Sequence, residues 1–429
     1  MTVSTAPLPG TRDFFPEEMS IRQQVFEHLY RVVESYGFVK YDAPMLEPFE
    51  LYAAKSSEEI VGTQIYRLTD RGGRDLVIRP EMTPSVARMI AAKAGQLALP
   101  ARWYSHPNLW RYERKQRGRY REHWQVNVDL FGTDSWEAEA EIFEVLAEMM
   151  FALGARTPDF VLRVSDRELV RGVLVGSAGV PEEKLGELFG VLDAFEKLPR
   201  EETEKRLTEL GLDAPRVIAA ITAPQGEFLR LVPPEIAEKS RLARVLSEGL
   251  TTSQPVQVKL DPLVIRGFTY YTSTVFEIFD TDPENRRSIA GGGRYDNLVG
   301  LFGKPRVPGI GFGMGDVTLI DFLHTHGIAP APRTGADAQV MAVDPSLRGK
   351  VKEIAARLRS AGMRVTTPMD ARKLGKQLER ASKEGARAAV IVGPAELERG
   401  FVKLRDLLRS EEREVALDGL ADALKALAP

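Results

Sequence analysis

The sequence predicts an α+β protein in which a large domain, built on an antiparallel sheet and interrupted by a helical insertion, precedes a small α/β domain. Three observations support this prediction. Apolar and polar residues alternate over residues 124–131, as they do in half-buried antiparallel strands. Residues 166–253 have a mainly helical pattern and are rich in Glu, Lys and Leu. After residue 335, strand-like and helical stretches alternate, which is typical of βαβ units.

The domain bounds follow from the length of the chain and from one linker-like stretch. A chain of 429 residues exceeds what one hydrophobic core usually supports, so two or three domains are expected. Residues 329–335 contain prolines and a glycine and have little to bury, which is typical of linkers. We therefore expect a large domain over 1–328, with the insertion at 166–253, and a small domain over 336–429.

The elements of both domains are predicted from periodicity and from stop signals. Apolar residues recur at helical spacing over 21–36 until Gly37. A second helix is expected between Asp134 or Ser135, as its N-cap, and Gly154. Strands of the large domain are expected at 38–46, broken at Pro44, at 76–78, 256–264 and 274–278, and in the glycine-rich stretch 291–315. In the small domain, strands are expected at 339–343, 364–366, 388–392 and 402–404, with helices at 347–360, at 372–383 and at the end of the chain.

The composition excludes several classes of function. The absence of cysteine rules out disulfides, thiolate zinc sites and cysteine nucleophiles. None of the five histidines falls in a metal-binding pattern, so we expect no metal ligands from protein side chains. No stretch approaches the roughly 20 apolar residues of a bilayer span, and residues 1–10 do not resemble a targeting segment. We expect a cytoplasmic protein without a membrane partner. Because the net charge is -3, a nucleic acid would have to bind a local basic patch.

The densest chemical signal is a basic loop at residues 110–121, between two strand-like stretches. Because side chains alternate along a strand, Arg111, Gln125 and Asp129 can share one face of the sheet. Guanidinium groups bind phosphates and carboxylates at two points, so arginines beside carboxylates indicate an anionic ligand with a cationic end. An amino acid together with ATP fits this description. A loop that binds only RNA fits it equally well.

These residues resemble the class II aminoacyl-tRNA synthetases and, within that class, the histidyl-tRNA synthetases. The loop beginning at Arg111 is similar to the second class motif, and residues 36–44 are similar to the first, whose Pro44 the resemblance places at a homodimer interface. Residues 264–277 and 290–296 are similar to the two histidyl signatures. The resemblance runs nearly end to end, and it implies a class II catalytic domain with a C-terminal anticodon-binding domain.

The activity that the resemblance implies is that of a histidine–tRNA ligase. Such an enzyme uses ATP to convert histidine to histidyl-adenylate and transfers the histidyl group to the 3′ end of tRNA(His). By the same resemblance, Glu81 would hold the ammonium group of histidine, and Asp129 and Tyr271 would bind the imidazole. The residues implied to bind histidine are Glu81, Met82, Thr83, Arg111, Gln125, Asp129, Arg266, Tyr270 and Tyr271.

The resemblance also implies the residues that bind ATP and tRNA. Arg111 and Arg266 would be catalytic, because Arg111 would contact the α-phosphate and the carboxylate while Arg266 would stabilise charge that develops at the α-phosphate. Arg119 would reach the outer phosphates and Glu113 would face the adenine, with Mg²⁺ on the pyrophosphate oxygens. The side chains implied to face the acceptor end of the tRNA are Lys115, Arg117 and Arg121.

Two positions depart from the family pattern. Thr318 stands where the third class motif normally ends in an arginine that holds the γ-phosphate, and Thr269 replaces an acidic residue that is common in the first histidyl signature. One charge-assisted phosphate contact is therefore missing. Either Arg119 and the metal compensate for it, or ATP activation is reduced.

These departures leave two other hypotheses open. One is a regulatory subunit of ATP phosphoribosyltransferase that binds histidine without catalysis. Such relatives typically lack the C-terminal domain and tend to lose the activating arginine, whereas this chain keeps Arg266 and the region after Gly335. The other is an RNA-binding or histidine-sensing module, which would require disruption of the phosphate arginines, yet Arg111, Arg119 and Arg266 are all present. We therefore favour the ligase.

Overall fold

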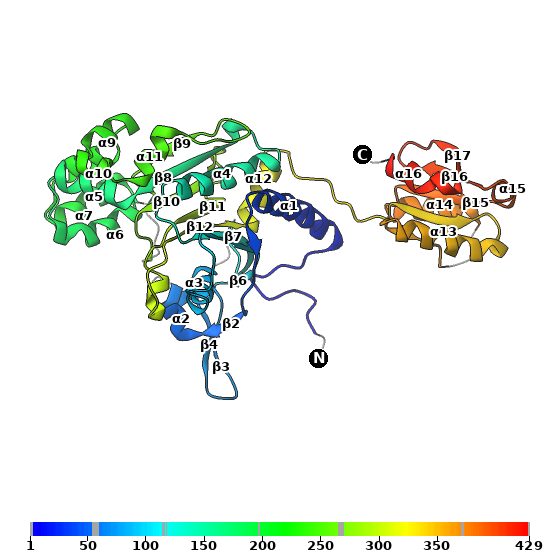
Figure 1. The fold of residues 1–429 in the computed structure, drawn as a ribbon, viewed down its shortest axis with the longest axis horizontal. Helices are drawn as coiled ribbons and strands as arrows, with labels where there is room; N and C mark the ends of the chain where they lie inside the picture. Colours follow the sequence, from blue (N-terminus) through cyan, green and yellow to red (C-terminus); the bar gives the residue numbers. More distant parts are fainter. Residues whose placement is uncertain are drawn as a thin grey trace. The chain divides into compact units, whose positions relative to one another are not determined.

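The computed structural model describes residues 3–53, 60–113, 116, 118–195, 198–264, 270–369 and 373–427. Backbone contacts divide the chain into two compact units, a larger one formed by Met1–Asp13 and Arg22–Pro330 and a smaller one formed by Phe14–Ile21 and Ala331–Pro429 (Figure 1). Among the described residues, no helix combines the length and hydrophobicity that a bilayer span requires.

The larger unit is built on a nine-stranded sheet with the order β1-β5-β7-β12-β11-β10-β8-β9, and β6 also pairs with β7. Neighbouring strands are antiparallel except at the two ends, where β1 is parallel to β5 and β8 is parallel to β9. The predicted antiparallel sheet is therefore confirmed. Its strands are β1 (Val39–Lys40), β5 (Ala101–Ser105), β6 (Asn108–Trp110), β7 (Glu122–Phe131), β8 (Phe160–Asp166), β9 (Val258–Leu260), β10 (Thr274–Asp280), β11 (Ala290–Arg294) and β12 (Gly309–Gly315).

The strand predicted over 38–46 is shorter than expected, and its predicted break at Pro44 is confirmed. Only Val39–Lys40 pairs with the large sheet, and Pro44 lies between β1 and the next strand, β2 (Leu46–Pro48). A proline has no N–H to donate to a neighbouring strand, which is consistent with a break there. Strand β2 belongs to a separate three-stranded sheet, β2-β4-β3, with β3 (Tyr66–Thr69) and β4 (Asp75–Ile78). The strand predicted over 256–264 is likewise shorter than expected.

Helices α4 (Glu137–Ala152) and α12 (Asp316–Thr325) pack against the central strands β7 and β12. Helix α4 ends before Gly154, as predicted, with that glycine at a φ of +93°. Its predicted N-cap is wrong, because the helix begins after Trp136 and no side chain caps it. Asp134 instead forms ion pairs with Arg241 and Arg306. The other helices of this unit outside the insertion are α2 (Phe49–Ala53), α3 (Thr83–Ala92) and the part of α1 (Pro16–Ser35) from Arg22 onward.

The helices expected over residues 166–253 are present and lie at one end of the larger unit, drawn in green in Figure 1. Asp166 caps the first of them by accepting hydrogen bonds from the backbone N–H groups of Glu168 and Leu169. The helices are α5 (Arg167–Gly176), α6 (Leu185–Asp193), α7 (Arg200–Glu209), α8 (Ala214–Ile221), α9 (Gln225–Leu231), α10 (Pro234–Ala237) and α11 (Arg241–Glu248).

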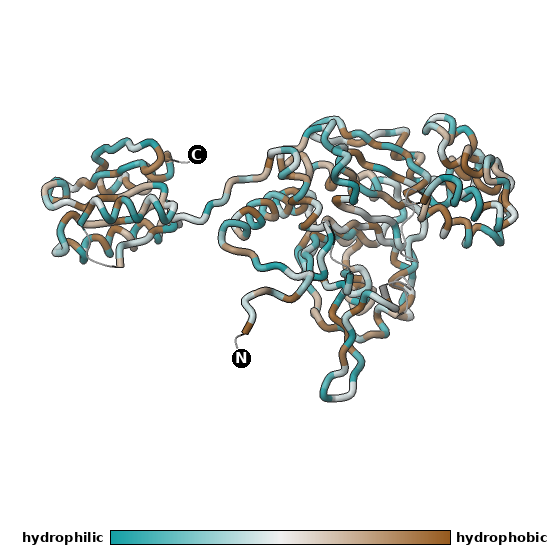
Figure 2. The backbone as a smooth tube through the Cα atoms, turned by 180° about the vertical axis from the view of Figure 1, so that it is seen from behind, coloured by the Kyte–Doolittle hydropathy of each residue, from teal (hydrophilic) through white to brown (hydrophobic). Residues whose placement is uncertain are grey.

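The smaller unit contains a five-stranded sheet with the order β14-β13-β15-β16-β17. Strand β13 is parallel to β14 and β15, as the predicted βαβ alternation requires, and the last two strands are antiparallel. In Figure 2 the backbone of this unit contains both hydrophobic and hydrophilic segments. The strands are β13 (Ala338–Ala342), β14 (Val365–Thr366), β15 (Ala388–Val392), β16 (Phe401–Asp406) and β17 (Glu412–Ala416), and the helices are α13 (Arg348–Ser360), α14 (Leu374–Lys383), α15 (Pro394–Glu398) and α16 (Leu420–Lys425).

A buried ion pair joins helix α4 to strand β11. The Arg294 guanidinium donates two hydrogen bonds of 2.6 Å to the Glu139 carboxylate, and both side chains are fully buried. Replacing Arg294 by Met should destabilise the larger unit by about 3–5 kcal/mol, because Glu139 would remain buried without its cation. We expect its Tm to fall by roughly 5–10 °C, measured by calorimetry. The double variant Arg294→Met, Glu139→Met should recover part of this loss, and a double variant less stable than the single one would contradict the explanation.

Candidate active site

Two cavities of the larger unit share part of their walls. The smaller has a volume of about 90 Å³ and the larger a volume of about 840 Å³. Arg111 and Gln125 line both, together with Gly291 of β11 and Gly313 of β12. A ligand can therefore extend from one cavity into the other past Arg111.

The smaller cavity brings together most of the residues that were predicted to bind histidine, namely Glu81, Thr83, Arg111, Gln125, Asp129, Tyr270 and Tyr271. Met82 does not line it, because its side chain is fully buried in the core at the start of α3. Arg266 lies outside the described residues, as do Lys115, Arg117 and Thr269.

The smaller cavity is lined by Gly291 of β11 and by Gly311 and Gly313 of β12. The two glycines of β12 pair with Asp129 and Asn127 of β7. A Cβ atom on Gly313 would lie 2.4 Å from the Gln125 side chain, and one on Gly311 would lie 2.5 Å from an Asp129 carboxylate oxygen. Side chains at these positions would fill the cavity, so glycine is required on this part of the sheet.

Glu81 provides negative charge at one side of the smaller cavity. It lies between strand β4 and helix α3 and is 4% exposed. The Tyr270 hydroxyl donates a 2.8 Å hydrogen bond to its carboxylate, and the Tyr52 hydroxyl donates to its backbone carbonyl. Burial of a carboxylate costs free energy that a positive charge offsets, so a ligand with an ammonium group would be stabilised beside Glu81.

Asp129 provides a second carboxylate, on strand β7. The hydroxyls of Tyr295 and Tyr41 donate hydrogen bonds to its two oxygens. Burial raises the pKa of Asp129 to about 7, although both tyrosine hydrogen bonds lower it. Near neutral pH this group therefore exists in both protonation states, and its ionised form can accept a hydrogen bond from an N–H group of a ligand.

The binding of histidine should weaken as the pH falls through 7. On the sequence-based prediction that Asp129 binds the imidazole, its ionised form would accept the imidazole N–H, and this form is lost below the raised pKa. Between pH 8 and pH 6 the dissociation constant should rise about tenfold, measured by calorimetry with allowance for the titration of free histidine. In the variant Asp129→Asn, binding should be weaker and should change little over this range. An equal pH dependence in both proteins would show that another group titrates.

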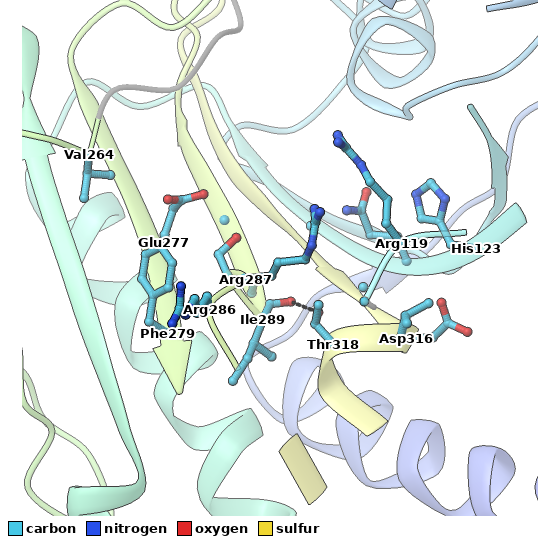
Figure 3. Close-up of a pocket in the computed structure, with 18 of the residues that line it drawn as sticks. Arg119, His123, Val264, Glu277, Phe279, Arg286, Arg287, Ile289, Asp316 and Thr318 are labelled. Atoms are coloured by element: carbon cyan, nitrogen blue, oxygen red, sulfur yellow. Dashed lines mark hydrogen bonds between the residues drawn. The ribbon is translucent and has the colours of Figure 1, made fainter. Parts of the chain in front are cut away.

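The larger cavity carries arginines on four segments. Arg111 follows β6, Arg119 lies in the loop before β7, Arg163 belongs to β8, and Arg286 and Arg287 precede β11. Figure 3 shows Arg119, Arg287 and Thr318 at this cavity, with Glu277 of β10 on another side. Several guanidinium groups around one cavity are suited to a polyphosphate.

Arg111 is held in place by the backbone, because its Nε donates a 2.9 Å hydrogen bond to the carbonyl of Pro80. Arg119 and Glu113, which were predicted to contact the outer phosphates and the adenine, form an ion pair with each other. His123 also lines this cavity, and burial followed by the nearby Arg111 charge lowers its pKa to about 3, so its imidazole is neutral.

Arg121 was predicted to face the acceptor end of a tRNA, and it does not line either cavity. Its guanidinium lies over the ring of Tyr112, 4.1 Å from the ring centre, and its Nε donates to the carbonyl of Glu113. The structure thus shows how this side chain is held within the loop.

Sequence reasoning missed Asn127, Tyr295 and Arg287 as site residues. Asn127 also lines the smaller cavity. It lies on the same face of β7 as Gln125 and Asp129, so the alternation that identified those two residues could have identified it. Tyr295 stands inside the second histidyl signature, but only the fold brings its hydroxyl to Asp129. The signal for Arg287 was a pair of arginines, Arg286 and Arg287, shortly before the glycine signature at 290–296.

The antiparallel sheet and the two adjoining cavities together define the catalytic domain of a class II aminoacyl-tRNA synthetase. A family model described as histidyl-tRNA synthetase matches residues 10–317, and a model described as anticodon binding domain matches residues 337–427. The chain belongs to the histidyl-tRNA synthetase family. The predicted family and fold class are therefore confirmed.

Individual proteins agree with this assignment. The histidine–tRNA ligase of Leptospira biflexa is 40% identical over 409 residues, which cover 94% of both chains. The crystal structure of histidyl-tRNA synthetase from Nostoc sp. PCC 7120 matches with a TM-score of 0.83 and 25% identity over the whole of both chains. A Bacillus halodurans structure described as an ATP phosphoribosyltransferase regulatory subunit/histidyl-tRNA synthetase has a TM-score of 0.72, but at 21% identity over 92% of this chain and 99% of its own it shows the fold alone. The regulatory-subunit hypothesis is not favoured.

Proposed function

We propose that this protein is a histidine–tRNA ligase, which makes histidyl-adenylate from histidine and ATP and then transfers the histidyl group to tRNA(His). The observation that carries the proposal is the pair of buried carboxylates, Glu81 and Asp129, in one small cavity that adjoins an arginine-lined cavity. Two acceptors fit the two N–H-bearing ends of histidine, and the arginines fit ATP.

Histidine is oriented by its ammonium group and by its side chain. Glu81 pairs with the ammonium group, to which Thr83 and Gln125 add hydrogen bonds. At the other side of the cavity, Asp129 accepts the imidazole N–H, next to Tyr271. A site with buried polar partners rejects analogues that lack the matching nitrogen more sharply than apolar walls could.

Activation joins the histidine carboxylate to the α-phosphorus of ATP as the bond to pyrophosphate breaks. Arg111 lies where the two cavities meet, so it can hold the carboxylate and the α-phosphate together. Arg266 adds positive charge at the α-phosphate. No nucleophile from the protein is needed, because positioning and electrostatic stabilisation account for this kind of transfer.

The remaining parts of ATP contact the larger cavity. Glu113 faces the adenine and Arg119 the outer phosphates, which requires their mutual ion pair to open or to be shared with the nucleotide. Within the described residues, no three acidic or histidine side chains form a metal cluster. Mg²⁺ nevertheless fits, because it needs only one or two carboxylates when phosphates supply other ligands, and Glu277 lines this cavity. The ion would neutralise charge on the pyrophosphate oxygens.

Transfer to tRNA uses the same site, with Lys115, Arg117 and Arg121 toward the acceptor end. Contacts of this kind are electrostatic, so tRNA binding should weaken as salt rises.

For the domains we propose 1–328 with the insertion 166–253, a linker at 329–335, and an anticodon-binding domain at 336–429. The division between Pro330 and Ala331 and the family matches at 10–317 and 337–427 support these bounds. A homodimer that includes the Pro44 region and a cytoplasmic location remain predictions.

One assay tests the function and separates the alternatives. The purified protein should catalyse histidine-dependent exchange of pyrophosphate into ATP, and should then attach histidine to tRNA(His). Exchange without charging would indicate a histidine-activating paralogue. No exchange, with histidine still bound, would indicate a regulatory or sensing subunit.

Sedimentation of the same sample should show a dimer, and a monomer alone would contradict the predicted interface.

A further inference from the structure

Thr318 leaves one end of the larger cavity without the arginine that the family pattern predicts. It lies in the first turn of α12 and lines the cavity (Figure 3). Its hydroxyl donates a long hydrogen bond, 3.5 Å, to the carbonyl of Ile289. The side chain is short and neutral, so this position of α12 contributes no positive charge toward the phosphates of ATP.

Arg287 reaches this same region from a different segment, the loop before β11. A Cβ atom built on Gly118 would lie 2.9 Å from Cδ of Arg287 and 3.4 Å from Cγ2 of Thr318. All three residues line both the larger cavity and an adjoining one of about 250 Å³. The Arg287 side chain therefore lies in the space next to residue 318.

The guanidinium of Arg287 is hydrogen-bonded to a neutral side chain, and the carboxylate that affects it electrostatically, Glu113, is paired with Arg119. The Nη2 atom of Arg287 donates a 2.7 Å hydrogen bond to the neutral Gln116 side chain, and Arg287 forms no ion pair with a described acidic residue. Burial lowers its pKa, the positive charge of Arg119 lowers it further and the Glu113 carboxylate raises it, and the guanidinium stays charged. Two arginines close together in a partly buried cavity favour the binding of an anion between them.

We propose that Arg287 binds the terminal phosphates of ATP and the departing pyrophosphate, in the role that the missing arginine at position 318 would have had. This inference rests on the proposed function. In this arrangement the guanidinium that contacts the phosphates comes from the β10–β11 loop instead of α12. Arg119 contacts the same phosphates from the side opposite Arg287. Gln116 orients the guanidinium through its side-chain oxygen.

The test compares ligands that have the outer phosphates with one that lacks them. Binding of ATP and of AMP is measured by calorimetry for the wild type, Arg287→Gln and Arg287→Lys. The control is Arg71→Gln, which removes an exposed arginine in the β3–β4 turn. Arg287→Gln should weaken ATP binding about 10- to 100-fold and AMP binding less than twofold, because charged hydrogen bonds of this kind are lost only with the longer ligand. Arg287→Lys should lose less, and the control should match the wild type.

A relocated charge provides a second test. The variant Arg287→Thr, Thr318→Arg should bind ATP more tightly than Arg287→Thr alone, because the guanidinium then comes from α12. Absence of any recovery would contradict the idea that the two positions serve the same phosphate. Equal weakening of ATP and AMP in Arg287→Gln would show a structural role instead, and unchanged ATP binding would exclude a phosphate contact.

The two proposals can fail separately. If the wild type shows no histidine-dependent exchange, the ligase function fails, yet the comparison of ATP with AMP still tests Arg287. Where exchange is present, Arg287→Gln should raise the KM for ATP about 10- to 100-fold and change the KM for histidine less than twofold. A rise in the histidine KM of the same size would overturn the assignment to the phosphates.

Discussion

Replacing Glu81 by Gln is expected to reduce kcat/KM for histidine in pyrophosphate exchange at least about 100-fold. The carboxylate is buried in the smaller cavity, where it would be the partner of the histidine ammonium group. Removing one partner of a buried charge pair costs roughly 2–5 kcal/mol, because the other charge is left desolvated and unpaired. The expected effect is therefore among the largest that a single substitution in this cavity can have.

The control for Glu81 is the variant Tyr270→Phe. It removes the 2.8 Å hydrogen bond to the Glu81 carboxylate and leaves the charge in place. We expect a loss of about tenfold, in keeping with a single hydrogen bond to a charged group. Thermal melting of both variants checks that the fold is kept. A Glu81→Gln protein that folds normally and keeps its KM for histidine would contradict the assigned role.

Replacing Arg111 by Gln is expected to lower kcat of pyrophosphate exchange about 100- to 1000-fold. Arg111 is shared by the two cavities, so in our proposal it holds the attacking carboxylate and the α-phosphate while charge develops between them. Loss of one oriented donor from such a site costs that much in other enzymes. The Nε hydrogen bond to Pro80 orients the guanidinium before substrate binds.

The variant Arg111→Lys separates charge from geometry. Lysine keeps the positive charge but lacks the planar fork that can contact two oxygens at once. We expect it to recover only part of the activity lost in Arg111→Gln, as measured by the same exchange assay. Full activity in Arg111→Lys would show that only charge matters, and unchanged activity in Arg111→Gln would remove Arg111 from the mechanism.

The local hydrophobic pattern of the sequence was sufficient to predict those strands and helices that bury one regular face. The alternation over 124–131 predicted β7 nearly to its ends, and the helical spacing over 134–154 predicted α4. It was not sufficient for β17, because this strand at the edge of the small sheet is exposed along most of its length and has no apolar face to reveal it. The N-cap of α4 failed for another reason, since Asp134 is used by Arg241 and Arg306 from distant parts of the chain.

Family-like motifs identified most of the candidate site, and the fold supplied the rest. Glu81, Gln125, Asp129, Tyr270 and Tyr271 were found in the sequence because each belongs to a recognisable segment, and they meet in one cavity. Tyr295 and Arg287 were not assigned roles, because their roles depend on contacts with residues far away in the sequence, Asp129 in one case and Gln116 in the other.

The sequence alone determined the antiparallel sheet, the helical insertion, the small α/β domain and the family, because hydrophobic periodicity and closely spaced motifs are local properties of the chain. It also identified Thr318 as a departure from the family pattern. Only the tertiary structure decided what lies next to Thr318 and what raises the pKa of Asp129 to about 7. Proximity and burial arise when segments far apart in the chain pack together, and no local pattern specifies which side chains will then share one cavity.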